Sequence, residues 1–253
     1  YKGVKHLRAL GETAVTAVEA DCGSKKLRFE TDMLLVHFGV IPDTHIYRLV
    51  GCHMEWQKEQ RYWYPSTDDW GRTNFERIFA AGDGTGVSGA LAAEFKGQLA
   101  ALEVAYCQGI IPRYERDHLA LSPLAELKKD GYPRPLVDAF FAPDPEQFSF
   151  EDATVVCRCE NITVGDVRTA VGEGVTDLNE VKTVTRCGMG PCQGRMCGPA
   201  LGEIVAAERH SSVPSAGLLV VRPPLKPVPL EEVAGMEIES GGADPANLFK
   251  NQS

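Results

Sequence analysis

The sequence lacks any hydrophobic run long enough to cross a bilayer. Its best candidate, residues 33–41, is far shorter than the roughly 20 residues that a membrane helix needs, and His37 interrupts it. Basic residues are also few, because 26 Lys and Arg stand against 35 Asp and Glu for a net charge of −9. We therefore expect no membrane span and no nucleic-acid or anionic-membrane partner.

The start of the chain lacks both an initiator Met and the charged and apolar regions of a signal peptide. We interpret the chain as a fragment, and without a secretory signal we expect a reducing, cytoplasmic location. There the eight cysteines suit metal binding or redox chemistry better than structural disulfides. The 253 residues, 43% of them hydrophobic, suffice for one large or two modest cores.

Residues 1–132 show an α/β pattern. The alternation over 13–20 and the short run at 27–29 predict strands, and the apolar stretch 32–40 predicts a further, buried strand. Residues 77–83 predict a short apolar strand that a glycine turn ends. Apolar residues at a spacing of three to four then predict a helix over 88–108.

A stretch rich in proline marks a boundary after residue 132. We interpret 133–154 as a linker and 155–212 as a small second domain. Residues 213–253 contain further prolines and predict an extended tail, with a frayed end beyond residue 241.

The second domain carries three helix-start signals. Thr163 and Asp166 have the spacing of a capping box, and Asp177 can cap a second helix. Pro191 suits the first position of a third helix, which we expect to continue to Arg209. The domain should therefore be mainly helical.

Five cysteines fall within this domain, and four of them form two pairs: Cys157 with Cys159, and Cys187 with Cys192. Two thiolate pairs from separate segments can converge on one metal centre. The C-x-C pair is unlike the C-x2-C knuckle usual for zinc, and glycines near the second pair let backbone amides approach sulfide. We favour an iron–sulfur centre over zinc, disulfides or free thiols. Cys197 lies about 140° further around the expected helix and is interpreted as a packed thiol.

At these residues a family resemblance emerges. The stretches CRCENITVGDVRTAV and TRCGMGPCQGRMCGP closely resemble the bacterioferritin-associated-ferredoxin-like [2Fe-2S] domain of the large subunits of opine oxidases, hydrogen cyanide synthase and hydroxyproline dehydrogenases. The resemblance covers about residues 155–210. It implies that Cys157, Cys159, Cys187 and Cys192 hold a [2Fe-2S] cluster.

A second resemblance concerns the glycine turn. Residues 73–83 resemble the second flavin motif of the pyridine-nucleotide-disulfide oxidoreductase class, in which the Asp accepts hydrogen bonds from ribityl hydroxyls. This implies FAD contacts at Gly82 and Asp83, and at Gly89 and Ala90, where the next helix begins and can face phosphates.

The flavin motif by itself also fits a plain strand-to-helix turn. Residues 34–43 resemble the strand-and-glycine motif of the same class, which favours the flavin. A G-x-G-x-x-G turn is absent from the sequence, and a redox C-x2-C or C-x4-C pair is absent from its first 150 residues. We therefore expect the adenine-dinucleotide half of the site to lie upstream of Tyr1, so that the FAD site is incomplete in this chain.

Together the resemblances imply an α/β fold, namely the C-terminal part of a flavoprotein with two dinucleotide-binding domains, followed by a small, mainly helical [2Fe-2S] domain. They imply an electron-transferring FAD and [2Fe-2S] component of a hetero-oligomeric dehydrogenase or oxidase. Its donor would be a CH–NH or CH–NH2 group of an amino acid, opine or related amine, oxidised in a smaller flavin-bearing partner subunit.

We assign no catalytic residue to this chain, because its six histidines stand in no triad-like spacing, and we expect the fragment to be inactive alone. Two alternatives remain open. One is a structural metal-binding docking module without electron transfer, and the other is a component of an NAD(P)H-dependent reductase.

Overall fold

The computed structural model describes residue 1 and residues 3–235, apart from the side chains of residues 145 and 146. The chain divides into two compact units, Tyr1–Val40 and the part from residue 41 onward. The expected frayed end beyond residue 241 lies outside the described residues.

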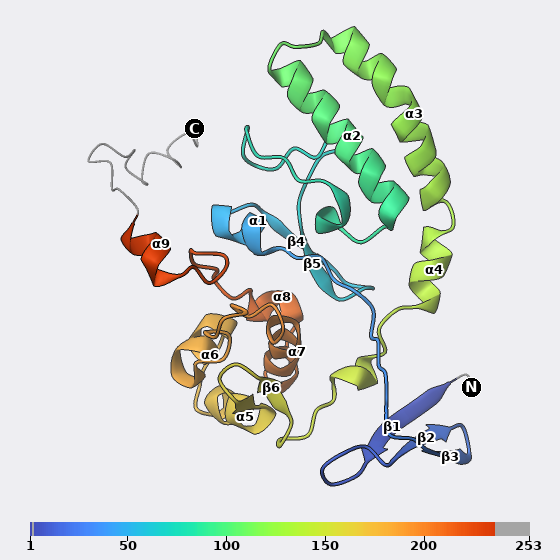
Figure 1. Cartoon of the computed structure of the whole chain (residues 1–253), viewed down its shortest axis with the longest axis vertical. Helices are drawn as coiled ribbons and strands as arrows, with labels where there is room; N and C mark the ends of the chain where they lie inside the picture. The colour runs from blue at the N-terminus through green and yellow to red at the C-terminus, as the bar shows by residue number, and fades with distance from the viewer. Residues whose placement is uncertain (2, 236–253) are drawn as a thin grey trace. The chain divides into compact units, whose positions relative to one another are not determined.

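The first unit is a three-stranded antiparallel sheet in the order β1-β2-β3 (Figure 1). Its strands are β1 (Val4–Leu10), β2 (Ala17–Cys22) and β3 (Lys25–Glu30). The strands predicted at 13–20 and 27–29 are confirmed as β2 and β3. β2 begins late because the backbone amide of Thr16 donates to the carbonyl of Leu10 at 2.8 Å and closes a turn.

The buried strand predicted over 32–40 is wrong. The backbone there belongs to no strand, and Met33, Leu35 and Phe38 are 66%, 85% and 70% exposed. An apolar run becomes a buried strand only where neighbouring strands pair with it, and among the described residues none does.

The second unit opens with a short helix, a hairpin and a helical pair (Figure 1). The elements in order are α1 (His45–Val50), β4 (Met54–Gln57), β5 (Tyr62–Pro65), η1 (Gly82–Thr85), α2 (Ala90–Cys107), α3 (Arg113–Gly131) and α4 (Arg134–Phe140). The helix predicted over 88–108 is confirmed as α2, which packs along α3. The strand predicted over 77–83 is reduced to one bridge between Phe79 and Arg72, because only this short neighbouring segment pairs with it.

A buried ionic cluster fixes α2 against α3. The Glu103 side chain is 1% exposed and accepts hydrogen bonds from Arg116 at 2.5 Å and from Arg72 at 2.8 Å. The Arg116 guanidinium also lies 4.2 Å from the ring centroid of Trp70. The buried carboxylate therefore has both charge partners that its burial requires.

The remaining elements form a small, mainly helical region (Figure 1). They are η2 (Pro145–Phe148), β6 (Val155–Cys157), β7 (Ile162–Thr163), α5 (Val164–Gly172), α6 (Leu178–Thr185), α7 (Gly198–Glu208), α8 (Val213–Ala216) and α9 (Leu230–Ala234). Thr163 and Asp166 form the predicted capping box of α5, and Asp177 caps α6. These two sequence predictions are confirmed.

The helix predicted over residues 191–209 is confirmed in its second part as α7, but its predicted start at Pro191 is wrong. Residues 191–197 form successive turns, and α7 starts only at Gly198. Gln193 and Gly194 have φ angles of 51° and 79°, a left-handed conformation that an α-helix cannot contain. The cysteine-rich segment is therefore a coiled loop that leads into α7.

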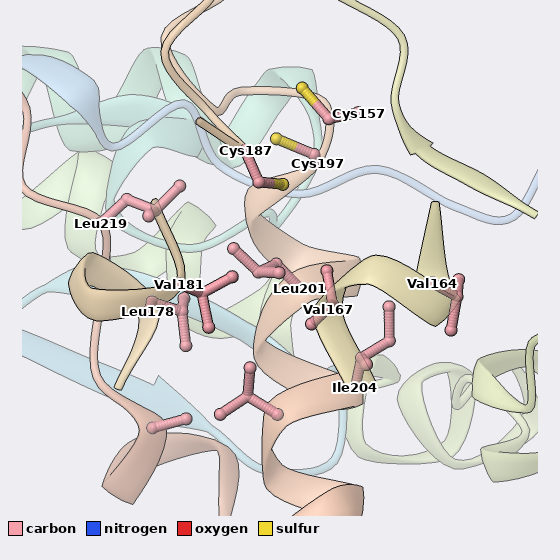
Figure 2. Close-up of a cluster of buried hydrophobic side chains, with 12 residues drawn as sticks. Cys157, Val164, Val167, Leu178, Val181, Cys187, Cys197, Leu201, Ile204 and Leu219 are labelled. Atoms are coloured by element: carbon pink, nitrogen blue, oxygen red, sulfur yellow. The ribbon is translucent and has the colours of Figure 1, made fainter. Parts of the chain in front are cut away.

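The core of this region joins α5, α6 and α7 around buried Val167, Val181 and Leu201, with three cysteines at one end (Figure 2). Leu219, from the segment after α8, belongs to the same core. Among the described residues no helix combines the length and apolarity needed to span a membrane.

Candidate metal centre and flavin turn

Three buried thiols meet at the end of this core. The Sγ atoms of Cys157, Cys187 and Cys197 all lie within 4.8 Å of one another, and each residue is at most 1% exposed (Figure 2). Cys157 ends β6, Cys187 follows α6, and Cys197 caps the start of α7. Sulfur ligands brought from three separate segments suit a thiophilic metal.

The other two cysteines of the segment lie beside each other. The Cys159 thiol forms hydrogen bonds with the backbone and the side chain of Cys192, and it also feels the charge of Cys157. Gly190 makes this contact possible, because a Cβ at position 190 would stand only 2.1 Å from the Cβ of Cys159. The five cysteines therefore fall into one buried group of three and one pair.

The structure groups the predicted ligands in a way that the sequence spacing does not show. Cys157 and Cys187 lie together, Cys159 and Cys192 lie together, and Cys197 joins the first group. The turns at 191–197 bring Cys197 into that group, whereas a continuous helix would have rotated it away. A positive φ at a non-glycine residue such as Gln193 has no clear sequence signal.

Hydrogen bonding among the buried thiols separates their acidities. A hydrogen bond from Cys187 lowers the pKa of Cys197 to about 7, and the same bond together with burial raises the pKa of Cys187. The group of thiols can therefore lose its first proton near neutral pH. This favours metal binding, because the thiolate is the form that binds a metal.

Leu219 covers the cysteine loop. A Cβ added at Gly188 or at Gly194 would stand 2.9 or 2.6 Å from Leu219 Cδ1, and both glycines have positive φ. The leucine therefore packs directly on bare backbone, and this part of the predicted tail is integral to the cysteine-rich core.

Helix α1 contacts both candidate sites. His45 Nε2 lies 2.9 Å from the carbonyl oxygen of Gln193 in the cysteine loop. On the other side, a Cβ at Gly84 in η1 would stand 2.9 Å from the Tyr47 hydroxyl. Burial, followed by the charge of Arg48, lowers the pKa of His45, so the ring is neutral at pH 7. Its role here is to tie α1 to the loop.

The glycine turn has the features that a flavin contact requires. Gly82 has a φ of 70°, and the exposed Asp83 accepts a hydrogen bond from the Ser88 amide at 3.2 Å. Gly89 precedes α2 without any side-chain cap, and a Cβ there would meet nothing within 4 Å. The first amides of α2, starting at Ala90, therefore have no side-chain cap, and the space beside Gly89 is open to a ligand such as a phosphate.

Lys96 is a residue of this turn that the sequence reasoning missed. Its Nζ donates to the Gly86 carbonyl and to Ser88 Oγ, each at 3.1 Å. Burial lowers the pKa of Lys96, and the charge of Asp83 opposes that shift. The sequence feature that could have identified it is that Lys96 is the one basic residue of α2, about two turns from the start of the helix.

Known proteins resemble the two regions that carry the glycine turn and the cysteines. The family model described as "Pyridine nucleotide-disulphide oxidoreductase" matches residues 2–109, which supports FAD as a cofactor. The model described as "Sarcosine oxidase A3 domain" matches residues 151–236. The A subunit of opine oxidase from Agrobacterium tumefaciens is 38% identical over 235 residues, covering 92% of this chain and 46% of the relative. This chain is a homologue of the opine oxidase A subunit.

The HcnB subunit of hydrogen cyanide synthase from Pseudomonas aeruginosa is also a homologue, 31% identical over 82% of this chain and 44% of its own length. The chain thus spans less than half of these relatives. The predicted relationship to the large subunits of these enzymes is confirmed. A [2Fe-2S] cluster and the domain boundaries stay predictions.

A solved structure confirms the predicted fold class. The crystal structure of L-proline dehydrogenase from P. horikoshii matches 88% of this chain and 42% of its own, with a TM-score of 0.63. At 19% identity this match shows the fold alone. The chain is a mixed α/β protein with a region of the pyridine nucleotide–disulphide oxidoreductase type.

Proposed function

We propose that this chain is the FAD- and [2Fe-2S]-bearing electron-transfer component of a hetero-oligomeric dehydrogenase or oxidase. Its substrate would be an amino acid, opine or related amine, oxidised at a CH–NH or CH–NH2 group in a smaller flavin-bearing partner subunit. Homology to one of the subunits of opine oxidase supports the substrate class and the multi-subunit arrangement. The eight cysteines, three of which meet in a buried group suited to a metal, support a reducing, cytoplasmic location.

One observation carries this proposal. Helix α1 contacts the flavin turn through Tyr47 and the cysteine loop through His45. Electron transfer between two centres needs them to be held close, and a six-residue helix in contact with both is a short link. A docking module without electron traffic would have no need of the flavin turn.

The donor set fits an iron–sulfur cluster. Such a cluster is held by four thiolates and accepts and releases single electrons. Cys159 and Cys192 supply one adjacent pair, and Cys157 with Cys187 supplies a second from the buried group. Cys197 is then the fifth thiol, packed against Cys187. Buried apolar surroundings, Leu219 among them, shield this end of the centre from water.

Asp83 and the first turn of α2 would hold part of FAD. The exposed carboxylate of Asp83 is free to accept a ribityl hydroxyl, and the uncapped amides after Gly89 are suited to phosphate. Lys96 holds the turn between them in shape through Gly86 and Ser88.

The test is co-purification of the gene product with the products of adjacent genes. We expect a complex that reduces an acceptor dye when an amine substrate is added. In this complex Cys159→Ser should block electron delivery to the dye. The substrate should still bleach the partner's flavin under anaerobic conditions, because that flavin lies upstream. Cys159 is chosen because it is exposed, so the fold tolerates serine there. Cys107→Ser, outside the cysteine domain and also exposed, is the matched control.

Two results would overturn the proposal. One is a Cys159→Ser complex that reduces the dye at the wild-type rate. The other is amine oxidation, complete through to the acceptor, by this chain without any partner.

A further inference from the structure

Arg48 is a half-buried cation that forms no ion pair with any carboxylate of the described residues. Within the part of the chain that the structure describes, its Nε is buried and has no hydrogen-bond partner, and a terminal nitrogen donates to the backbone carbonyl of Leu219. Among the described residues no ion pair includes Arg48. Burial lowers its pKa to about 10, so the guanidinium stays charged at neutral pH. A charge whose Nε is buried without a hydrogen-bond partner is costly, and an anion bound beside it would offset that cost.

The guanidinium lines a cavity of about 220 Å³. The cavity lies between α1, the β4–β5 hairpin, the start of α7 and the segment after α8, all within the second unit. Trp56 and Trp63 line it from the hairpin, and their ring centroids are 5.4 Å apart. The cavity therefore combines an unpaired cation with an aromatic wall.

Asp43 is the one acidic residue among those lining the cavity, and its charge favours the charged form of Arg48. Asp43 accepts hydrogen bonds from the His45 amide at 3.0 Å and from Arg195 at 3.5 Å. Arg61 is held by Glu203, with Nε to Oε1 at 2.7 Å. The neutral His45 adds no charge. Arg48 and Arg195 therefore share the one carboxylate of Asp43, and the lining keeps one positive charge in excess.

We propose that this cavity binds a small organic anion, whose carboxylate or phosphate group pairs with the Arg48 guanidinium and whose apolar part lies against Trp56 and Trp63. Guanidinium binds both oxyanions in a bidentate manner. The volume is below the roughly 300–1,000 Å³ of sites for larger ligands, which excludes a dinucleotide. The site is separate from Asp83 and from the cysteines, and it stands whether or not the chain transfers electrons.

Tryptophan fluorescence and thermal unfolding test the site with three probes that share one ring: benzoate, phenyl phosphate and neutral benzyl alcohol. We expect a saturable fluorescence change and a higher unfolding temperature with at least one anion, and neither effect with benzyl alcohol. The two anions tell a carboxylate ligand from a phosphate ligand. Measurements at constant ionic strength remove general salt effects.

Arg48→Met should weaken binding of that anion at least tenfold, and it should raise the unfolding temperature of the anion-free protein because the buried charge is gone. Arg48→Lys keeps the charge and should retain part of the binding. Arg113→Met removes an exposed arginine of α3 and should bind as the wild type does. Equal binding in Arg48→Met, equal binding of benzyl alcohol, or no binding of either anion would overturn the proposal.

Discussion

Glu103 carries the ionic contact that holds α2 to α3. Although its burial would raise its pKa, hydrogen bonds from Arg72 and Arg116 hold the pKa of Glu103 below its usual value. Because the lowered pKa belongs to the folded state, the contact stabilises fully above about pH 4.5. The contribution is lost as the pH falls through the lowered pKa.

We expect Glu103→Gln to reduce the free energy of unfolding by about 3 kcal/mol at pH 7, because Arg72 and Arg116 lose their buried charge partner and keep only more exposed aspartates. The free energy of unfolding of the variant should also fall less steeply than that of the wild type between about pH 5 and pH 3, because no carboxyl is protonated at position 103. Urea unfolding at several pH values measures both. Glu126→Gln, in an exposed pair with Lys129, should change stability by less than about 0.5 kcal/mol. Equal effects of the two substitutions would contradict this account.

Gly190 sets the approach of Cys159 to Cys192. We expect Gly190→Ala to displace Cys159, because the added Cβ would stand 2.1 Å from the Cβ of that cysteine. Metal content after anaerobic reconstitution should fall at least severalfold. Gly172→Ala, at the end of α5, is the control, since its Cβ would meet nothing within 4 Å. A Gly190→Ala protein that loads metal as Gly172→Ala does would show that this contact is dispensable.

At the scale of elements, the segment after α8 belongs to the cysteine-rich core. We expect Leu219→Ala to cost about 3 kcal/mol of stability, because it opens a cavity over Gly188 and Gly194. Val220→Ala next to it removes a side chain that is 53% exposed and should cost less than about 0.5 kcal/mol. Thermal and urea unfolding of the two variants show whether the loss of stability comes from the buried side chain or from any change in this segment. A similar, small loss of stability in both variants would show that this segment is not part of the core.

Helix starts with local signals were predictable, and segments shaped by distant partners were not. The Thr163–Asp166 capping box and the Asp177 cap lie within one turn of the helices they begin, so the sequence alone identifies them. The run 32–40 was apolar enough for a strand, but strand formation depends on pairing that the local sequence does not specify. The turns before α7 depend on a left-handed Gln193, which no residue preference predicts.

The same limit applies to the candidate site. Spacing identified the segments that carry Cys157, Cys159, Cys187 and Cys192, and the structure brings these into two adjacent groups. The spacing did not reveal that Cys197 joins the buried group, because the position of Cys197 depends on the path of the loop. Lys96 and His45 were missed for a related reason, since neither contact is local. Lys96 reaches back to the carbonyl of Gly86, and His45 lies against the carbonyl of Gln193, which is distant in sequence.

At the scale of the whole molecule, the flavin turn and the cysteine centre belong to one unit with α1 in contact with both. The match to the pyridine nucleotide–disulphide oxidoreductase model ends at residue 109, and the match to the A3 domain begins at residue 151. The α1 contacts therefore connect a region of flavoprotein type to the cysteine-rich region. This connection gives the proposed electron transfer its structural basis.

The central claim is a [2Fe-2S] cluster on four of the five clustered cysteines. Iron, zinc and labile sulfide analysis, with visible and paramagnetic resonance spectra of the anaerobically reconstituted protein and its five Cys→Ser variants, tests it most directly. We expect equal amounts of iron and sulfide, with a reduced-state signal that serine at Cys157, Cys159, Cys187 or Cys192 abolishes and serine at Cys197 preserves. Zinc without sulfide, or a signal lost in Cys197→Ser and kept in Cys192→Ser, would contradict this account.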